Sequence, residues 1–195
     1  MAAGRGRDQM MFRRKTAGTR AGFSPPSNMA TIKHNFTIVA PREQVFQAVS
    51  TLDGLNGWWT TGTTGNPNRG GKLRFEFDNG CYNLMQVTDV RRNKFAAWKC
   101  RESSFPSGRE WIGTVVTFRL SKDGERNTQV EFEHGGWRKA SDFYGRCNFH
   151  WGRFMVSLKL LCETSRGEPY VVGSETDPGI PKMEMARAGG AMRTA

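Results

Sequence analysis

Apolar and polar side chains alternate along short stretches of the chain, and this pattern predicts most of the secondary structure. Residues 31–39 (TIKHNFTIV) alternate and are rich in β-branched side chains, which is typical of a strand. A proline then opens residues 41–51, where three apolar residues recur at helical spacing. We therefore expect the fold to begin with a strand and a short amphipathic helix.

Five further segments show the period-two alternation of strands. They are residues 72–77, 81–90, 94–100, 111–120 and 128–134. The connections between them are short, and the Asp-Asn-Gly before residue 81 is a strong hairpin signal. Because parallel strands need long crossover connections, these short links predict an antiparallel meander.

The last predicted element is a long helix over residues 141–163. Its apolar positions fall within one arc of about 120° when each residue advances by about 100°. These positions are Phe143, Tyr144, Cys147, Trp151, Phe154, Met155, Leu158, Leu161 and Cys162. Ser141 or Asp142 can cap the start of this helix, and Gly167 with a following proline can end it.

The order of these elements predicts an α+β fold. A curved antiparallel sheet of about six strands would wrap round one long C-terminal helix, with one or two short helices after the first strand. The long helix is the only predicted element that can cover the apolar face of the sheet. A helix held by a curved sheet tends to leave a cavity, because the two surfaces differ in curvature.

Charge and composition divide the chain into a core domain and two tails. The 195 residues have a net charge of +11, of which residues 1–28 carry +5. This Arg- and Gly-rich segment cannot bury a core, so we expect a basic disordered tail, or a stretch upstream of a true start at Met29. The domain would then span residues 29–167, and the aperiodic residues 168–195 would form a loose tail. Because much of the charge lies in a tail, it does not predict specific nucleic-acid binding.

The cysteines and the apolar runs exclude two further classes of protein. The four cysteines, Cys81, Cys100, Cys147 and Cys162, form no C-x-x-C pair, and the three histidines complete no zinc spacing. We therefore expect no metal and no cofactor, with buried free thiols in a reducing cytoplasm. The sequence has no run of about 18 apolar residues, so we expect no transmembrane segment.

Several sequence blocks, in their order and spacing, resemble the SRPBCC superfamily (START-like, helix-grip), in the branch of the C-terminal domain of the heat-shock-protein ATPase activator. The matching blocks are PREQVFQAVSTLDGLNGWWT at 41–60, GGKLRFEF at 70–77, MQV at 85–87, AWKC at 97–100, WIGTVVTFRL at 111–120, VEFEHGGW at 130–137, and the run from Trp151 to Lys159. The resemblance covers about residues 30–165. It implies a cavity for an apolar small molecule but no single chemistry, because members include lipid carriers, cyclases, hormone receptors and co-chaperone-like proteins.

Two adjacent tryptophans stand in residues 52–65 (LDGLNGWWTTGTTG), which we expect to form a surface loop because Gly, Thr and Asn surround them. In the helix-grip fold this segment would lie near the open end of the cavity. Trp58 and Trp59 would then either plug the core or line the cavity mouth. We expect Trp59 to be the plug and Trp58, which follows a glycine, to be the mobile gate.

The predicted ligand cavity is lined mainly by aromatic side chains that face inward by strand parity or helix periodicity. The lining residues are Trp58, Trp59, Phe75, Phe77, Met85, Trp98, Trp111, Phe132, His134, Trp151, Phe154 and Leu158. His134 is the candidate catalytic residue, as a base or as a group that polarises a ligand carbonyl. The alternative is a hydrogen-bonded histidine that closes its strand, because no carboxylate partner lies near it in sequence.

Three functions fit these observations. A non-enzymatic protein that binds an apolar ligand, such as a lipid or a polyketide, accounts best for the aromatic lining. A cyclase or hydrolase would need His134 to act with Tyr82, Tyr144 or Asp142. A co-chaperone-like contact with a chaperone follows only from the resemblance, and the activator's additional N-terminal domain has no counterpart here, so we expect no stimulation of a chaperone ATPase. The sequence holds no complete phosphate-binding loop, nucleophile elbow or zinc-deaminase signature.

Overall fold

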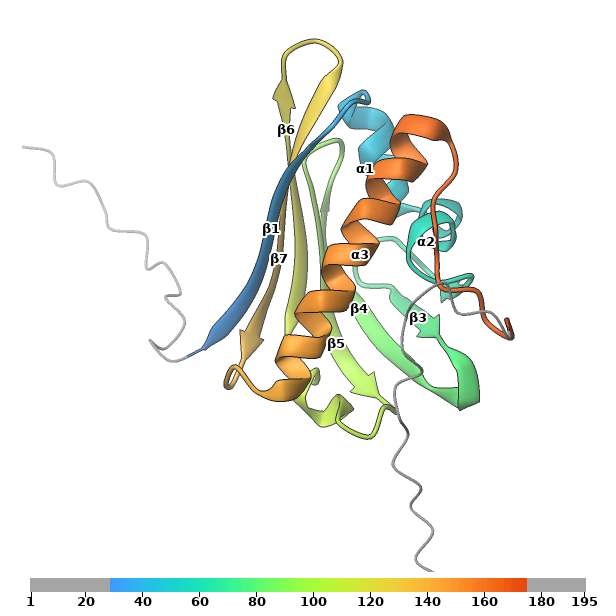
Figure 1. The fold of residues 1–195 in the computed structure, drawn as a ribbon, viewed down its shortest axis with the longest axis vertical. Helices are drawn as coiled ribbons and strands as arrows, with labels where there is room; N and C mark the ends of the chain where they lie inside the picture. The colour runs from blue at the N-terminus through green and yellow to red at the C-terminus, as the bar shows by residue number, and fades with distance from the viewer. Residues whose placement is uncertain (1–28, 175–195) are drawn as a thin grey trace, which may run out of the picture.

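The computed structural model describes residues 29–174, in which a curved sheet is covered on one face by a long helix (Figure 1). The elements are β1 (Ala30–Ile38), α1 (Arg42–Ser50), α2 (Leu52–Trp58), β2 (Gly62–Gly65), β3 (Lys72–Glu76), η1 (Asp78–Gly80), β4 (Tyr82–Arg91), β5 (Phe95–Ser103), η2 (Gly108–Glu110), β6 (Val115–Asp123), β7 (Asn127–Trp137) and α3 (Asp142–Thr164). The predicted basic tail at 1–28 lies outside the described residues, as do residues 175–195 of the predicted C-terminal tail.

All seven strands form one antiparallel sheet in the order β1-β7-β6-β5-β4-β3-β2. Strands β2 to β7 follow one another as a meander, and β1 returns to pair with β7. The predicted Asp-Asn-Gly turn is present as η1, where Asn79 has a φ of 59° in the left-handed region. Helix α3 crosses one face of the sheet, and α1 and α2 pack beside it (Figure 1).

This architecture confirms the predicted α+β helix-grip fold, with seven strands rather than about six. The additional strand is β2, a four-residue edge strand with the sequence GTTG. Its lack of apolar alternation gave no strand signal. Within residues 29–174, no helix is long and apolar enough to cross a membrane.

The prediction of a surface loop for the segment with the two tryptophans is wrong, because its first half forms helix α2 and its last four residues form β2. Thr51 caps this helix, since its hydroxyl accepts a hydrogen bond from the amide of Gly54 at 3.1 Å. A Cβ at Gly54 would lie 2.5 Å from the Cα of Ala48, so glycine permits close packing of α2 against α1. The glycine that resembled a loop signal is therefore a packing residue.

The predicted strand at residues 111–120 begins later, at Val115. Residues 111–114 form a turn in which the Thr114 hydroxyl donates to the Trp111 carbonyl oxygen at 2.6 Å. Gly113 has a φ of 90°, which glycine adopts without strain. Trp111 is buried as predicted, but the turn, not strand parity, directs it inward.

Helix α3 agrees with the predicted helix to within one residue at each end. Ser141 is the N-cap, and its hydroxyl accepts a hydrogen bond from the amide of Tyr144 at 3.2 Å. The helix ends at Ser165, which has a φ of 61°, and not at Gly167. Gly167 instead allows a close approach, because a Cβ there would lie 2.2 Å from the carbonyl oxygen of Gly57.

Residues 168–174 run back along the connection between α2 and β2, which differs from the loose tail predicted from residue 168. The Tyr170 amide donates to the Trp59 carbonyl oxygen at 2.8 Å, and the Thr61 amide donates to the Tyr170 carbonyl oxygen at 2.9 Å. The Tyr170 hydroxyl also donates to the carboxylate of Asp78 at 2.6 Å. These bonds join distant segments mostly through the backbone, so side-chain periodicity could not reveal them.

Candidate functional site

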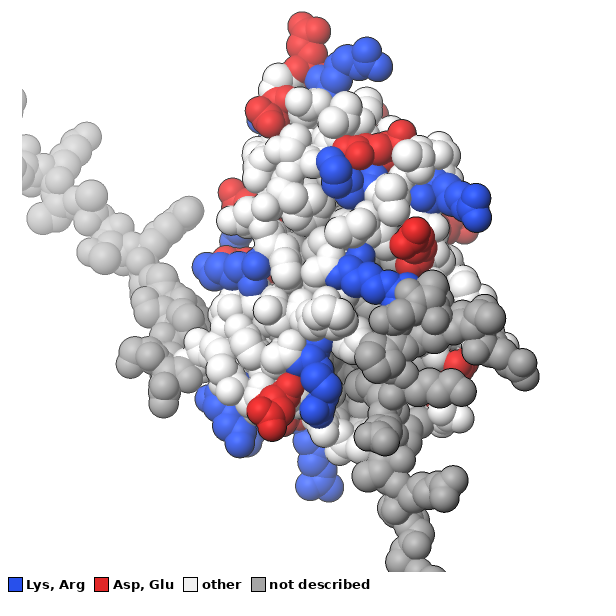
Figure 2. Space-filling view, viewed as in Figure 1, with Lys and Arg blue, Asp and Glu red and all other residues white. Residues whose placement is uncertain are grey.

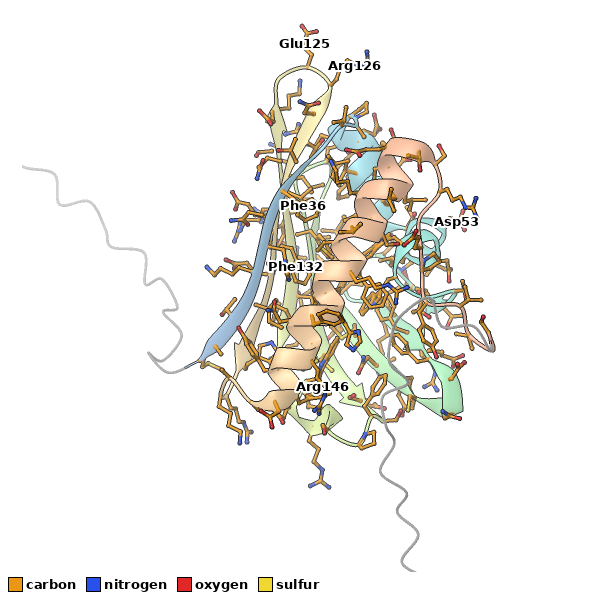
Figure 3. The ribbon with its side chains drawn as sticks, viewed as in Figure 1. Phe36, Asp53, Glu125, Arg126, Phe132 and Arg146 are labelled. Atoms are coloured by element: carbon orange, nitrogen blue, oxygen red, sulfur yellow. The ribbon has the colours of Figure 1, made fainter. Side chains whose placement is uncertain are left out.

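The predicted cavity residues meet between the sheet and α3, and all but Phe77 are buried. They come from α2 and β3 with the residue that follows each, from the inner face of β4, β5 and β7, from the 111–114 turn and from α3. Phe132 of β7 lies in this layer, among the side chains between the sheet and the helix (Figure 3). The sequence pattern therefore found the residues of one contiguous interior.

The centre of this interior is filled by side chains in mutual contact. The ring of Trp59 lies 3.9 Å from that of Phe75 and 5.0 Å from that of Trp151, measured between centroids. The rings of Phe132 and Trp151 are 4.7 Å apart. Such spacings are those of packed aromatic pairs. The aromatic residues at this centre therefore form a packed core.

Trp58 and Trp59 are both core residues, with exposed fractions of 0% and 2%. The Trp58 indole donates from Nε1 to the Ala48 carbonyl oxygen at 2.9 Å, which ties it to α1. Its ring makes an edge contact with Phe118 at 5.9 Å. This burial does not fit the expected mobile gate at Trp58, because helix α2 turns both indoles inward.

His134 is completely buried and has a partner on each ring nitrogen. The Trp151 indole donates from Nε1 to His134 Nδ1 at 3.0 Å. His134 Nε2 therefore carries the proton and donates to the Thr114 hydroxyl at 2.8 Å, which itself donates to the Trp111 carbonyl oxygen. Burial lowers the pKa of His134 to about 3, so the ring is neutral near pH 7.

This hydrogen-bond network matches the non-catalytic alternative for His134. A base needs a free lone pair on a nitrogen that a substrate can reach, and Nδ1 is already accepting from Trp151. Of the three partners considered for an enzyme, Asp142 is exposed at the start of α3, and the Tyr82 hydroxyl donates to Glu102 at 3.5 Å. Tyr144 is half-buried and packs against Trp137, with ring centroids 5.4 Å apart. His134 therefore supplies internal hydrogen bonding to the aromatic core.

All four cysteines are free and buried, as predicted. Burial raises the pKa of Cys100, Cys147 and Cys162 to about 12, which keeps these thiols protonated near pH 7. In the part of the chain that the structure describes, no cluster of three His, Cys, Asp or Glu side chains could hold a metal ion. The four buried thiols pack in the interior of the domain.

The edge of the core, where β3, β4 and β5 lie side by side, combines half-buried aromatic rings with polar side chains. Side chains that face each other across paired strands share one face of the sheet. The half-buried rings of Phe77 and Phe105 meet there with centroids 5.3 Å apart. One step further in, Asn83 lies opposite Phe75 on one side and opposite Ser103 on the other. We call Phe77, Phe105, Asn83 and Ser103 the rim site.

The rim site holds polar atoms that lack hydrogen bonds. Asn83 is 3% exposed, and neither its Oδ1 nor the Oγ of Ser103 has a partner among the described residues. Most other buried polar side chains of this part of the chain have partners, namely Thr60, Thr63, Thr114, Thr128, His134 and Ser157. Trp137 Nε1, Thr117 Oγ1, Asn93 Oδ1 and His34 Nε2 are further buried atoms without a partner among the described residues. A buried unpaired polar group costs about 1–3 kcal/mol. The rim site thus combines apolar walls with unused hydrogen-bonding capacity.

The sequence interpretation included Phe77 but missed the two polar residues of the rim site. Asn83 occupies an inward position in the alternating run from Cys81 to Val87, and its polarity at such a position was the available signal. Ser103 lies beyond residue 100, where the predicted strand ended. Their pairing depends on the register of β4 against β5, which periodicity does not define.

A separate surface pocket of about 440 Å³ lies between α1 and the turn that joins β4 to β5. Phe46 and Val90 provide apolar lining, and Glu43 and Arg92 form an ion pair of 3.2 Å beside them. The pocket thus combines a small apolar lining with charged neighbours.

Comparisons with known proteins agree with this architecture. The family model described as "Activator of Hsp90 ATPase homolog 1-like protein" matches residues 39–163. The solution structure of the Aha1 dimer from Colwellia psychrerythraea is 33% identical, covers 71% of this chain and 99% of its own, and superposes with a TM-score of 0.62. Two further solved structures share the fold. An X-ray structure of a Mesorhizobium loti protein is 22% identical, covers 68% of this chain and 96% of its own, and has a TM-score of 0.60. A solution structure of a Bacillus halodurans protein is 24% identical, covers 69% of this chain and 97% of its own, and has a TM-score of 0.55. The comparison with curated proteins gave no match.

Proposed function

Since the chain belongs to the family of activator of Hsp90 ATPase homolog 1-like proteins, we propose that it binds an apolar small molecule carrying a hydroxyl or amide group, and that the ligand occupies the rim site. The observation that supports this proposal is the unpaired, buried Oδ1 of Asn83 behind half-buried aromatic rings. Ligand sites typically combine aromatic walls with a few placed polar groups. A hydroxyl fits best, because it can donate to Asn83 and accept from Ser103.

Replacement of Asn83 by leucine is expected to separate ligand binding from stability. The variant should be at least as stable as the wild type, because it removes an unpaired buried polar group, yet it should bind a hydroxylated ligand about tenfold or more weakly. We would titrate both proteins with 2-naphthol and with 2-methylnaphthalene, two molecules of similar size, and follow amide chemical shifts by NMR.

Met85→Leu is the matched control, because Met85 lies one inward position further along β4 and is apolar. It should retain the preference of the wild type for the hydroxylated probe. Equal affinities of the wild-type protein for the two probes, or unchanged 2-naphthol binding in Asn83→Leu, would contradict the proposal.

A second candidate function is a contact with a chaperone of the Hsp90 type, which the family description and the pocket beside α1 favour. Charge reversal of Arg92, which is exposed and paired with Glu43 at the pocket, should then weaken binding to such a chaperone at least about tenfold without changing the melting temperature. Calorimetric titration of the purified pair measures this effect. Absence of heat with the wild-type protein would eliminate this candidate and leave ligand binding untouched.

We also propose that the chain self-associates. The Colwellia relative, at 33% identity over 71% of this chain, was solved as a dimer. Sedimentation equilibrium of the full chain tests this directly, and a monomer at all accessible concentrations would contradict it.

A further inference from the structure

The outer face of α3 carries an ordered row of large and small residues, which we call the α3 row. Phe149 and Val156 are 66% and 56% exposed, although both are apolar. Gly145 and Gly152 alternate with them at spacings of four, three and four residues. At about 100° per residue, the four positions fall within an arc of about 60° on the side opposite the buried face of the helix.

Figure 2 shows this side of the molecule. Neutral surface extends along much of α3, and charged side chains lie at both ends of the helix and beside its middle. Arg146 marks the N-terminal half of the helix (Figure 3). Phe149 and Val156 therefore stand on a largely neutral strip of the helix, with Arg153, Lys159 and Glu163 close by at helical spacing.

Packing within one copy of the chain does not require glycine at either of the two glycine positions of the α3 row. A Cβ built on Gly145 would have no atom within 4 Å, and one on Gly152 would meet only His34 Cε1 at 3.6 Å, an ordinary contact. Glycine inside a helix costs about 1 kcal/mol relative to alanine. Packing inside the molecule thus does not account for this cost at either position, whereas close approach of a second backbone would.

The spacing of the α3 row is self-complementary when two copies of the helix lie antiparallel. In the register that places Phe149 opposite the partner subunit's Gly152, Val156 lies opposite the partner subunit's Gly145. Two-fold symmetry repeats both pairs, so that every large side chain meets a glycine. A parallel arrangement would instead set Phe149 against the partner's Phe149.

The helix dipoles also favour the antiparallel arrangement, because antiparallel packing opposes the two dipoles.

We propose that a second copy of this chain docks on the α3 row, helix against helix in antiparallel orientation, with Phe149 and Val156 inserted over the partner's glycines. This inference rests on the proposed self-association and adds the surface and the register.

The first test measures the dimer dissociation constant of the full chain by sedimentation equilibrium. Phe149→Ser should raise this constant at least about 30-fold, because the change removes a large central apolar contact. Ile112→Ser is the matched control, since Ile112 is also apolar and exposed but lies in the 111–114 turn. It should leave the constant unchanged.

The second test addresses the register. Gly145→Val alone would set valine against valine, and Val156→Gly alone would set glycine against glycine, so each should weaken the dimer about tenfold. The double variant Gly145→Val/Val156→Gly again opposes valine to glycine and should recover most of the wild-type affinity. Its overall helix composition is unchanged, and circular dichroism confirms that each variant folds.

The outcomes separate the two levels of the proposal. A monomeric wild type contradicts self-association itself. A dimeric wild type with an unchanged constant in Phe149→Ser places the interface elsewhere and overturns the α3 row. Weakened single variants without recovery in the double variant contradict the antiparallel register.

Discussion

Replacement of Trp59 by alanine is expected to lower the free energy of unfolding by about 3–5 kcal/mol, as large-to-small changes in a packed core do. Trp59 is 2% exposed. Its ring lies 3.9 Å from that of Phe75 and 5.0 Å from that of Trp151, so truncation would open a cavity between the sheet and α3.

Trp58→Ala is expected to cost a similar amount, although the sequence suggested a mobile gate there. Trp58 is 0% exposed and packs edge-on against Phe118. Its loss would also leave the buried Ala48 carbonyl oxygen without the indole donor. The two variants should therefore behave alike, and neither should act only on ligand uptake.

Equilibrium urea unfolding of both variants measures these costs. Ile112→Ala is the control, since an exposed apolar side chain should change stability by less than about 0.5 kcal/mol. A cost below about 1 kcal/mol for Trp58→Ala, combined with altered probe binding, would restore the gate and refute its assignment to the core.

The second large expected effect is a loss of folding stability as the pH falls. Burial lowers the pKa of His134 to about 3, from an ordinary value of 6.5. As the pH falls below about 6.5, the unfolded chain binds a proton at this residue while the folded protein does not. The stability that His134 contributes is therefore complete above pH 6.5 and is lost between pH 6.5 and about pH 3, at up to about 1.4 kcal/mol per pH unit.

A comparison of the wild type with His134→Gln isolates this effect. Glutamine keeps a donor and an acceptor for Trp151 and Thr114 but does not titrate. Between pH 7 and pH 5 the wild type should lose about 2 kcal/mol more stability than the variant. His34→Gln, on the neighbouring strand β1, serves as the comparison: burial lowers the pKa of His34 as well, so this variant should remove a smaller part of the acid loss and retain most of it.

Urea unfolding at each pH gives the two stability curves. Parallel curves for the wild type and His134→Gln would mean that His134 titrates normally in the folded protein. That result would require the imidazole to be reachable by water, and it would reopen the catalytic interpretation.

The sequence alone was sufficient for the fold class and for most of the interior. Period-two alternation located the strands, and the long amphipathic arc located α3 to within one residue at each end. This succeeded because burial on one face imposes a periodicity that each element carries within itself. The same periodicity placed Phe75, Phe132 and Trp151 in the interior.

Tertiary structure decided the features that join segments distant in the chain. Helix α2 forms in a stretch of poor helix propensity because Gly54 permits contact with Ala48, which no local pattern reveals. Trp111 is directed inward by a turn, and residues 168–174 are held by backbone bonds to the connection between α2 and β2.

The chemistry of the candidate site depended even more on three-dimensional contacts. His134 looked like a possible base until the structure placed Trp151 and Thr114 on its two nitrogens. Asn83 and Ser103 became a pair only through the register of β4 against β5. Periodicity states which face a side chain occupies, whereas its hydrogen-bond partners depend on how separate elements align, and that alignment is a property of the whole fold.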